Sequence, residues 1–177
     1  MDNQIFNASM NTQLISSQAV KLLTKLTGQD LTVHDITPQM VFMANLIALL
    51  KGVIHADAKV SEDEVAQFNA TLSRLNLSGK QTVEVAKLLL SGIQKYKLYV
   101  HAKIDDFLIL LAPLCEAEKL LLFGLGYRMA MADSYLDASE SRYLRDLGKR
   151  LEIESRYLDV LEFSFGGKSY ARSFTMS

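Results

Sequence analysis

The chain repeats a short acidic pattern, and this repeat constrains the fold more than any other feature of the sequence. Asp57 and Glu64 recur as Asp133 and Glu140, 76 positions later. The same offset also aligns apolar residues: Leu46 with Leu122, Leu49 with Leu125, Phe68 with Leu144 and Leu75 with Leu151. Because the matches fall on the acids and on apolar residues at helical spacing, they indicate a duplicated helix–turn–helix. We therefore expect an all-α fold in which one helical hairpin occurs twice.

Apolar periodicity and the usual start and stop residues predict seven to eight helices in a single compact bundle. The expected helices cover about 13–27, 38–55, 61–75, 80–97, 104–111, 116–132, 137–151 and 154–163. No segment alternates with period two over five residues, so no strand is expected. The domain is expected to run from 11 to 163, between a flexible lead-in at 1–10 and a polar C-terminal tail at 164–177.

Composition argues against several classes of protein. The formal net charge of −1 offers no basic field for a phosphate backbone, so nucleic acid is not an expected partner. The single cysteine, Cys115, rules out an intrachain disulfide and a four-cysteine zinc site. The sequence does not start like a signal peptide, and its longest apolar stretches, 107–115 and 41–50, have about half the length of a membrane span. We expect a cytoplasmic protein that does not span a membrane.

Each copy of the repeated turn ends in the pattern that starts a helix. Ser61 with Glu64, and Asp137 with Glu140, have the spacing of a capping box, in which each side chain accepts a hydrogen bond from the other residue's backbone N–H. Each cap stabilises its helix by about 1 kcal/mol. The helix that follows Ser61 is expected to bury an apolar stripe: Val65, Phe68, Leu72 and Leu75.

Capping does not explain Asp57 and Asp133, because each follows a helix C-terminus, where the helix dipole disfavours a carboxylate. Two accounts are open. The aspartate could accept hydrogen bonds from its own turn, or it could lie beside the glutamate seven positions later with a cation between them. The second account makes Asp57, Glu64, Asp133 and Glu140 candidate ligands of Ca²⁺ or Mg²⁺, which prefer oxygen donors. The spacing is not that of an EF-hand, so both turns or backbone carbonyls must complete the ligand shell.

Catalysis by the paired carboxylates is the competing interpretation, and it would make the chain a carboxylate-dependent metal hydrolase. The sequence offers no obvious nucleophile–base pair, however. His34, His55 and His101 are scattered, and none has a glutamate three positions earlier, as a di-iron helical bundle requires. No catalytic or cofactor-binding residue is therefore assigned, and we expect a non-enzymatic interaction module.

The segments Ile54–Glu64 and Met129–Glu140 resemble the tellurite-resistance TerB-like family. In that family an alanine–aspartate–glycine turn precedes an apolar residue and an acidic helix start that ends in glutamate. The resemblance covers about Met40 to Glu162, with Ala58 and Ser134 in place of the usual glycine. It extends to the related N-terminal domain of a membrane-anchored DnaJ-like co-chaperone.

What the resemblance implies agrees with the repeat and adds a biological setting. It implies a compact bundle with pseudo-twofold repeats and with the acidic residues gathered on one side. It also implies a stress-response role, divalent-metal binding, and a protein partner, which includes the option of a membrane-associated complex.

Overall fold

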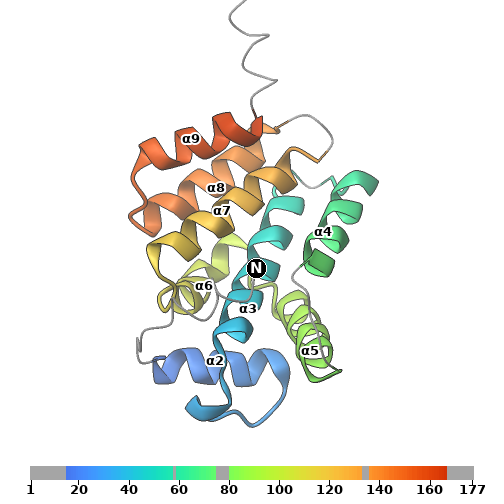
Figure 1. The fold of residues 1–177 in the computed structure, drawn as a ribbon, viewed down its shortest axis with the longest axis vertical. Coiled ribbons are helices and arrows are strands. Elements are labelled where there is room, and N and C mark those ends of the chain that lie inside the picture. The colour runs from blue at the N-terminus through green and yellow to red at the C-terminus, as the bar shows by residue number, and fades with distance from the viewer. Residues whose placement is uncertain (1–14, 58, 75–79, 133–135, 167–177) are drawn as a thin grey trace, which may run out of the picture. The chain divides into compact units, whose positions relative to one another are not determined.

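The computed structural model describes residues 15–57, 59–74, 80–132 and 136–166. This part of the chain holds eight α-helices, two short 3₁₀ turns and no strand, so the predicted all-α fold is confirmed (Figure 1). The helices are α2 (Ser17–Thr27), α3 (Pro38–Ile54), α4 (Glu62–Arg74), α5 (Lys80–Tyr96), α6 (Ile104–Leu111), α7 (Glu116–Ala130), α8 (Ala138–Arg150) and α9 (Ser155–Gly166). The 3₁₀ turns are η1 (Val33–Asp35) and η2 (His101–Lys103).

The ends of the helices reproduce the sequence repeat. The last residues of α3 and α7, Ile54 and Ala130, are 76 positions apart. Helix α4 spans 62–74 and α8 spans 138–150, so both of their ends are also 76 positions apart. The next helices begin 75 positions apart, α5 at Lys80 and α9 at Ser155, but α5 has 17 residues and α9 has 12. The part of the repeat that the helix ends reproduce is therefore the predicted helical hairpin.

The described residues fall into two compact units, and the division lies within α3 and α7. The first unit comprises the described parts of 1–48 and 77–119. In it, α2 packs against α5 and α6. A Cβ atom on Gly92 would lie 1.8 Å from the carbonyl oxygen of Leu26, so the close approach of α5 to the end of α2 requires glycine. Helix α3 starts as predicted. Pro38 is its first residue, and the side chain of the preceding Thr37 caps it by accepting from the Met40 N–H (3.2 Å).

A buried asparagine joins α3 to α6 within the first unit. Asn45 is fully buried, and its Nδ2 donates to the carbonyl oxygens of Val41 (2.9 Å) and Leu110 (2.7 Å). The Leu110 carbonyl needs this donor because the chain turns at the end of α6, where the Leu114 N–H bonds to Leu111 instead. The polar residue in the otherwise apolar stretch at 41–50 thus satisfies a helix C-terminus.

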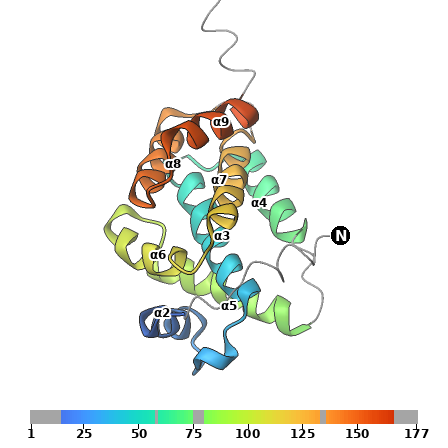
Figure 2. The ribbon, with the colours of Figure 1, turned by 60° about the vertical axis from the view of Figure 1, so that its left-hand side comes forward.

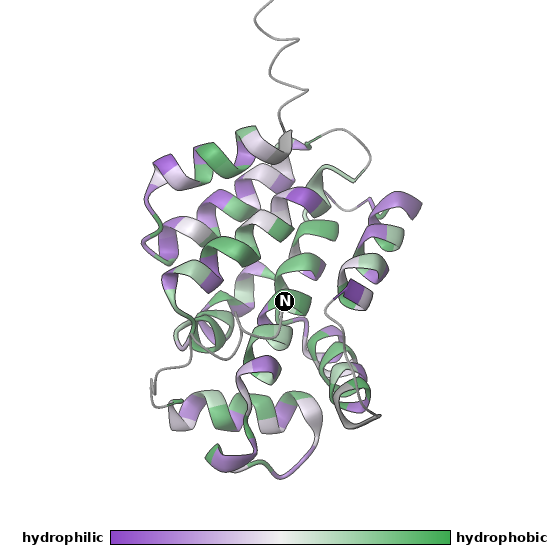
Figure 3. Cartoon of the chain, in the orientation of Figure 1, coloured by the Kyte–Doolittle hydropathy of each residue, from purple (hydrophilic) through white to green (hydrophobic). Residues whose placement is uncertain are grey.

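The second unit comprises the described parts of 49–76 and 120–177 and contains α4, α8, α9 and the adjoining parts of α3 and α7. Helices α7, α8 and α9 lie side by side in both views (Figures 1 and 2). Apolar segments alternate with polar ones along each of these helices (Figure 3). Glycines bring the helices together: a Cβ on Gly126 would lie 2.9 Å from Leu144, and one on Gly148 would lie 2.7 Å from Leu158.

The buried face of α4 differs from the predicted stripe. Val65 is 45% exposed, and the residues buried on α4 are Glu64, Phe68 and Thr71. Helix α8 buries the corresponding positions, Glu140, Leu144 and Leu147, together with Gly148. The helix is therefore rotated so that its capping glutamate, and not the next apolar residue, points inward. Leu75 lies outside the described residues.

No helix in the described part of the chain has both the length and the apolar character needed to cross a membrane.

Candidate functional site

The first repeated turn forms the predicted capping box. The Ser61 N–H donates to Glu64 Oε2 (2.7 Å), and the Glu64 N–H donates to Ser61 Oγ (3.1 Å). Both bonds satisfy backbone or side-chain groups at the start of α4 that would otherwise have no intrahelical partner. The capping bond holds the Glu64 side chain back against its own helix terminus and so determines where its carboxyl lies.

The second turn repeats this geometry. The Asp137 N–H donates to Glu140 Oε2 (3.1 Å), while the Asp137 side chain accepts from the backbone at the start of α8, including the Ser139 N–H (2.7 Å). The two capping glutamates therefore have the same role and conformation at equivalent positions of the repeat. Each uses Oε2 for the cap, which leaves the second oxygen, Oε1, outside the capping bond.

The two capping glutamates meet in the interior of the second unit. Glu64 is 5% exposed and Glu140 is 3% exposed. The pKa of Glu140 is raised to about 8, first by burial and then by a hydrogen bond with the Glu64 carboxyl and the charges of Glu64 and Asp57, against the opposing effect of the hydrogen bond from the Asp137 N–H. Glu140 is therefore mostly protonated at neutral pH and shares its proton with Glu64.

Asp57 closes its own turn, as one of the two accounts of this residue predicted. Its Oδ1 accepts from the Lys59 N–H at 2.8 Å, the i to i+2 bond of an Asx turn. Its charge also contributes to the raised pKa of Glu140, so it lies near the glutamate pair. Asp133, the equivalent residue of the second turn, lies outside the described residues, as do Ala58 and Ser134.

His55 lies between this acidic turn and the end of α3. Partial burial lowers its pKa, Lys51 lowers it further, and Glu64 opposes the shift. A ring that is neutral at pH 7 does not supply the positive charge that would suit the C-terminal end of the α3 dipole. His55 thus adds no charge to balance the carboxyl pair.

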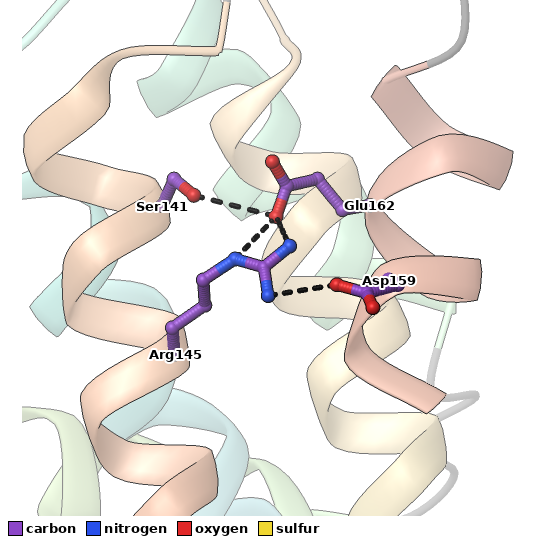
Figure 4. A network of polar contacts seen from close by, with 4 residues as sticks. All are labelled: Ser141, Arg145, Asp159 and Glu162. Atoms are coloured by element: carbon purple, nitrogen blue, oxygen red, sulfur yellow. Dashed lines mark hydrogen bonds and ion pairs between the residues drawn. The ribbon is translucent and has the colours of Figure 1, made fainter. Parts of the chain in front are cut away.

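A third buried glutamate of the same unit has its charge compensated by an ion pair (Figure 4). Glu162 of α9 accepts from Arg145 Nε (2.8 Å) and Nη2 (2.6 Å) and from Ser141 Oγ (3.4 Å). Arg145 Nη1 also bonds Asp159 (2.9 Å). By contrast, the ion pairs between described residues include neither Glu64 nor Glu140. The Arg145–Glu162 pair was not predicted, because its only signal in the sequence is two opposite charges on adjacent predicted helices.

The carboxylate oxygens of the site are of the type that a hard cation prefers, but the described residues supply fewer of them than such a cation needs. Carboxylate oxygens are the preferred ligands of Ca²⁺ and Mg²⁺, and a divalent cation would replace the proton that Glu140 retains. Among the described residues, however, no three His, Cys, Asp or Glu side chains are gathered closely enough to hold a metal ion. Glu64 and Glu140 would hold it, and further ligands must come from outside this set: Asp133, backbone carbonyls or water.

Fold and site together define a class of helical protein: a duplicated helical hairpin whose two capping boxes bring their glutamates into one buried pair. The chain belongs to the TerB family, since the family model described as tellurite resistance protein TerB matches residues 43–161, more than half of the chain. The matched region contains both repeated turns and excludes α2. Comparisons with curated proteins and with solved structures gave no significant match.

Proposed function

We propose that the protein is a non-enzymatic interaction module whose duplicated acidic turns bind one divalent cation, Ca²⁺ or Mg²⁺. The observation that carries the proposal is the buried Glu64–Glu140 pair. Two carboxyls that share a proton at neutral pH form a site where a cation can replace that proton and balance both charges. Glu64 and Glu140 are the two central ligands of this proposal, Asp133 is the third, and backbone carbonyls or water complete the shell. The charge of the nearby Asp57 favours the cation.

The bound cation would act on the shape of the module rather than on a substrate. Both glutamates cap helix N-termini, so a cation that ties them together also ties the start of α4 to the start of α8. The ends of these helices form the surface that a protein partner would recognise. Membership of a family described by tellurite resistance supports a tellurite-resistance-like helical module. In this proposal the cation regulates binding of the partner.

Calorimetric titration with Ca²⁺, Mg²⁺ and Mn²⁺ at pH 7 tests the cation site. If the cation displaces the proton held by Glu140, binding releases about one proton per cation, and the measured heat then depends on the ionisation enthalpy of the buffer. The Glu140→Gln variant keeps a capping side chain but has no proton to release. We expect it to bind the cation at least tenfold more weakly, with no dependence on the buffer.

Glu118→Gln is the matched control variant. Glu118 is a buried capping glutamate of α7 that accepts from the Cys115 N–H (2.9 Å), and it belongs to the other unit. Its replacement is expected to leave cation binding unchanged. Absence of binding heat, together with a melting temperature that millimolar cation does not raise, contradicts the proposal and leaves the glutamate pair a purely structural element.

A further inference from the structure

The first unit carries a concentration of exposed lysines that the cation proposal does not use. Helix α2 contains Lys21 and Lys25 and no acidic residue, and the stretch 85–104, from α5 to the start of α6, also contains no acidic residue. Lys95 lies in the last turn of α5, and Lys97 directly follows this helix. All four lysines are exposed. Residues 1–48 and 77–119 as a whole contain as many acidic residues as lysines, so the excess of positive charge is confined to these two stretches.

Tyr96 joins the lysines of the two elements into one surface. Lys25 Nζ lies 4.5 Å from the centroid of the Tyr96 ring, and Lys95 Nζ lies 5.3 Å from it. Both distances are those of cation–π contacts between α2 and α5 or within α5. We call Lys21, Lys25, Lys95, Tyr96 and Lys97 the Lys–Tyr patch. Lys21 belongs to it because it precedes Lys25 by one helical turn and so lies on the same face of α2.

The type of basic residue in the patch indicates the type of ligand that it binds. Residues 1–48 and 77–119 contain eight lysines, no arginine and eight acidic residues, none of which lies in α2 or in 85–104. Arginine, with its planar fork, suits bidentate recognition of single phosphate or carboxylate groups, whereas lysine is a hydrated point charge on a flexible stem. Lysines around a tyrosine suit a diffuse anionic surface, where the ammonium groups reach outward and the tyrosine lies at the boundary between apolar and aqueous regions. Single-stranded nucleic acid fits less well, because two ammonium groups already occupy the Tyr96 ring on which a base would stack.

We propose that the Lys–Tyr patch docks the protein onto an anionic phospholipid surface. The proposal goes beyond the cation site and is independent of it, because the patch lies in the first unit and the glutamate pair in the second. Each lysine near an anionic leaflet contributes about fivefold to partitioning, so four lysines favour anionic over neutral vesicles by roughly 600-fold. The attraction is electrostatic and weakens steeply as ionic strength rises.

Sedimentation of the full chain with vesicles tests the proposal. The vesicles consist of phosphatidylcholine alone or with about a third phosphatidylserine, in EDTA, at low and at high salt. We expect binding only to the vesicles that contain phosphatidylserine, and only at low salt. The EDTA removes any contribution from a bound cation, so failure here leaves the cation proposal standing, and failure of the calorimetry leaves this proposal standing.

The informative variant is Lys21→Gln with Lys97→Gly, which removes one charge from each element. Glycine at position 97 suits the left-handed backbone there (φ 49°), so the variant retains its fold. We expect partitioning to fall by about 25-fold. The matched control, Lys87→Gln with Lys149→Gln, removes two exposed lysines outside the patch and is expected to change partitioning less than twofold.

Three outcomes overturn the proposal. The first is wild-type protein that does not bind phosphatidylserine vesicles at low salt. The second is a control variant that loses as much binding as the patch variant, since net charge alone would then explain the attraction. The third is patch-dependent binding to an RNA oligonucleotide or to polyglutamate in place of vesicles, which would assign the patch to a different anionic partner.

Discussion

Replacing Glu140 by glutamine should make the protein more stable at neutral and alkaline pH and leave its stability unchanged in mild acid. The folded protein holds the pKa of Glu140 at about 8, against 4.5 for an unperturbed glutamate. Between these values the folded state keeps a proton that the unfolded state has lost. The free energy of unfolding therefore falls as pH rises from about 4.5 to about 8 and then levels off.

The size of the effect follows from the same values. In the unfolded chain Glu140 has a pKa of 4.5, which is about 2.5 units below pH 7. Each of these pH units lowers the free energy of unfolding by about 1.4 kcal/mol, so the buried pair costs about 3 kcal/mol at pH 7. Glutamine cannot titrate, and it can still accept the capping bond from Asp137 N–H. We expect the Glu140→Gln variant to gain most of this energy at pH 7, a rise in melting temperature of about 6–12 °C.

Thermal and urea unfolding between pH 4.5 and 9 in EDTA measure this difference. The difference in free energy of unfolding between variant and wild type should increase with rising pH and vanish near pH 4.5. Glu118→Gln, the same change in the buried cap of α7, is the control for the loss of a buried capping carboxylate outside the pair. Parallel stability curves for Glu140→Gln and wild type, or a variant that is less stable at pH 8, would refute the proton-sharing pair.

Three further predictions concern packing, backbone and charge in the described part of the chain. Gly52→Ala should cost about 2–4 kcal/mol in urea unfolding, because the new Cβ would lie 1.9 Å from the Tyr143 hydroxyl; a loss below about 0.5 kcal/mol contradicts the close approach. Lys97→Gly should raise stability by about 0.5–1 kcal/mol, because it relieves a left-handed backbone (φ 49°), and a loss contradicts this. Arg145→Met should cost about 3–5 kcal/mol, because it leaves the Glu162 carboxylate buried without its partner. Adding Glu162→Gln should recover part of that loss, and a double variant no more stable than the single one contradicts the assignment.

The sequence was sufficient to predict the helices and their caps because local chemistry determines them. The capping boxes at Ser61 and Asp137 and the Thr37-Pro38 start of α3 all occur where the residue types require them. Helix α6 has its predicted bounds, and most other ends lie within one to three residues of the prediction. Helix α9 continues to Gly166, beyond the expected end at residue 163, because nothing in 164–166 stops a helix before the glycines.

The rotation of α4 could not be predicted from the local pattern. An apolar stripe through Val65 and Phe68 is the usual expectation for an amphipathic helix. The structure places Glu64 inward because its capping bond draws the side chain toward the helix start, where it meets Glu140. That encounter depends on two segments 76 positions apart, and only the repeat hinted that they share a role. The sequence therefore identified the acids as a group, and tertiary packing determined which two of them form the pair.

The charge compensation of buried acids was likewise beyond sequence reasoning. Glu162 and Glu140 are both buried glutamates of the second unit, yet Arg145 neutralises the first and another carboxyl faces the second. Burial of an uncompensated pair costs stability, and sites of binding or catalysis are where such a cost is commonly found. This contrast is the reason that we propose the duplicated turns as the functional part of the fold.

The most direct test of the account is a ¹³C NMR titration of the glutamate side-chain carboxyls in EDTA. The Glu140 resonance is assigned by its loss in the Glu140→Gln variant. We expect a midpoint near pH 8 for Glu140 and a large downward shift of that midpoint when Ca²⁺ or Mg²⁺ is added. A midpoint near the ordinary value of 4.5 in the absence of cation would contradict it, because Glu140 would then carry its charge without sharing a proton with Glu64.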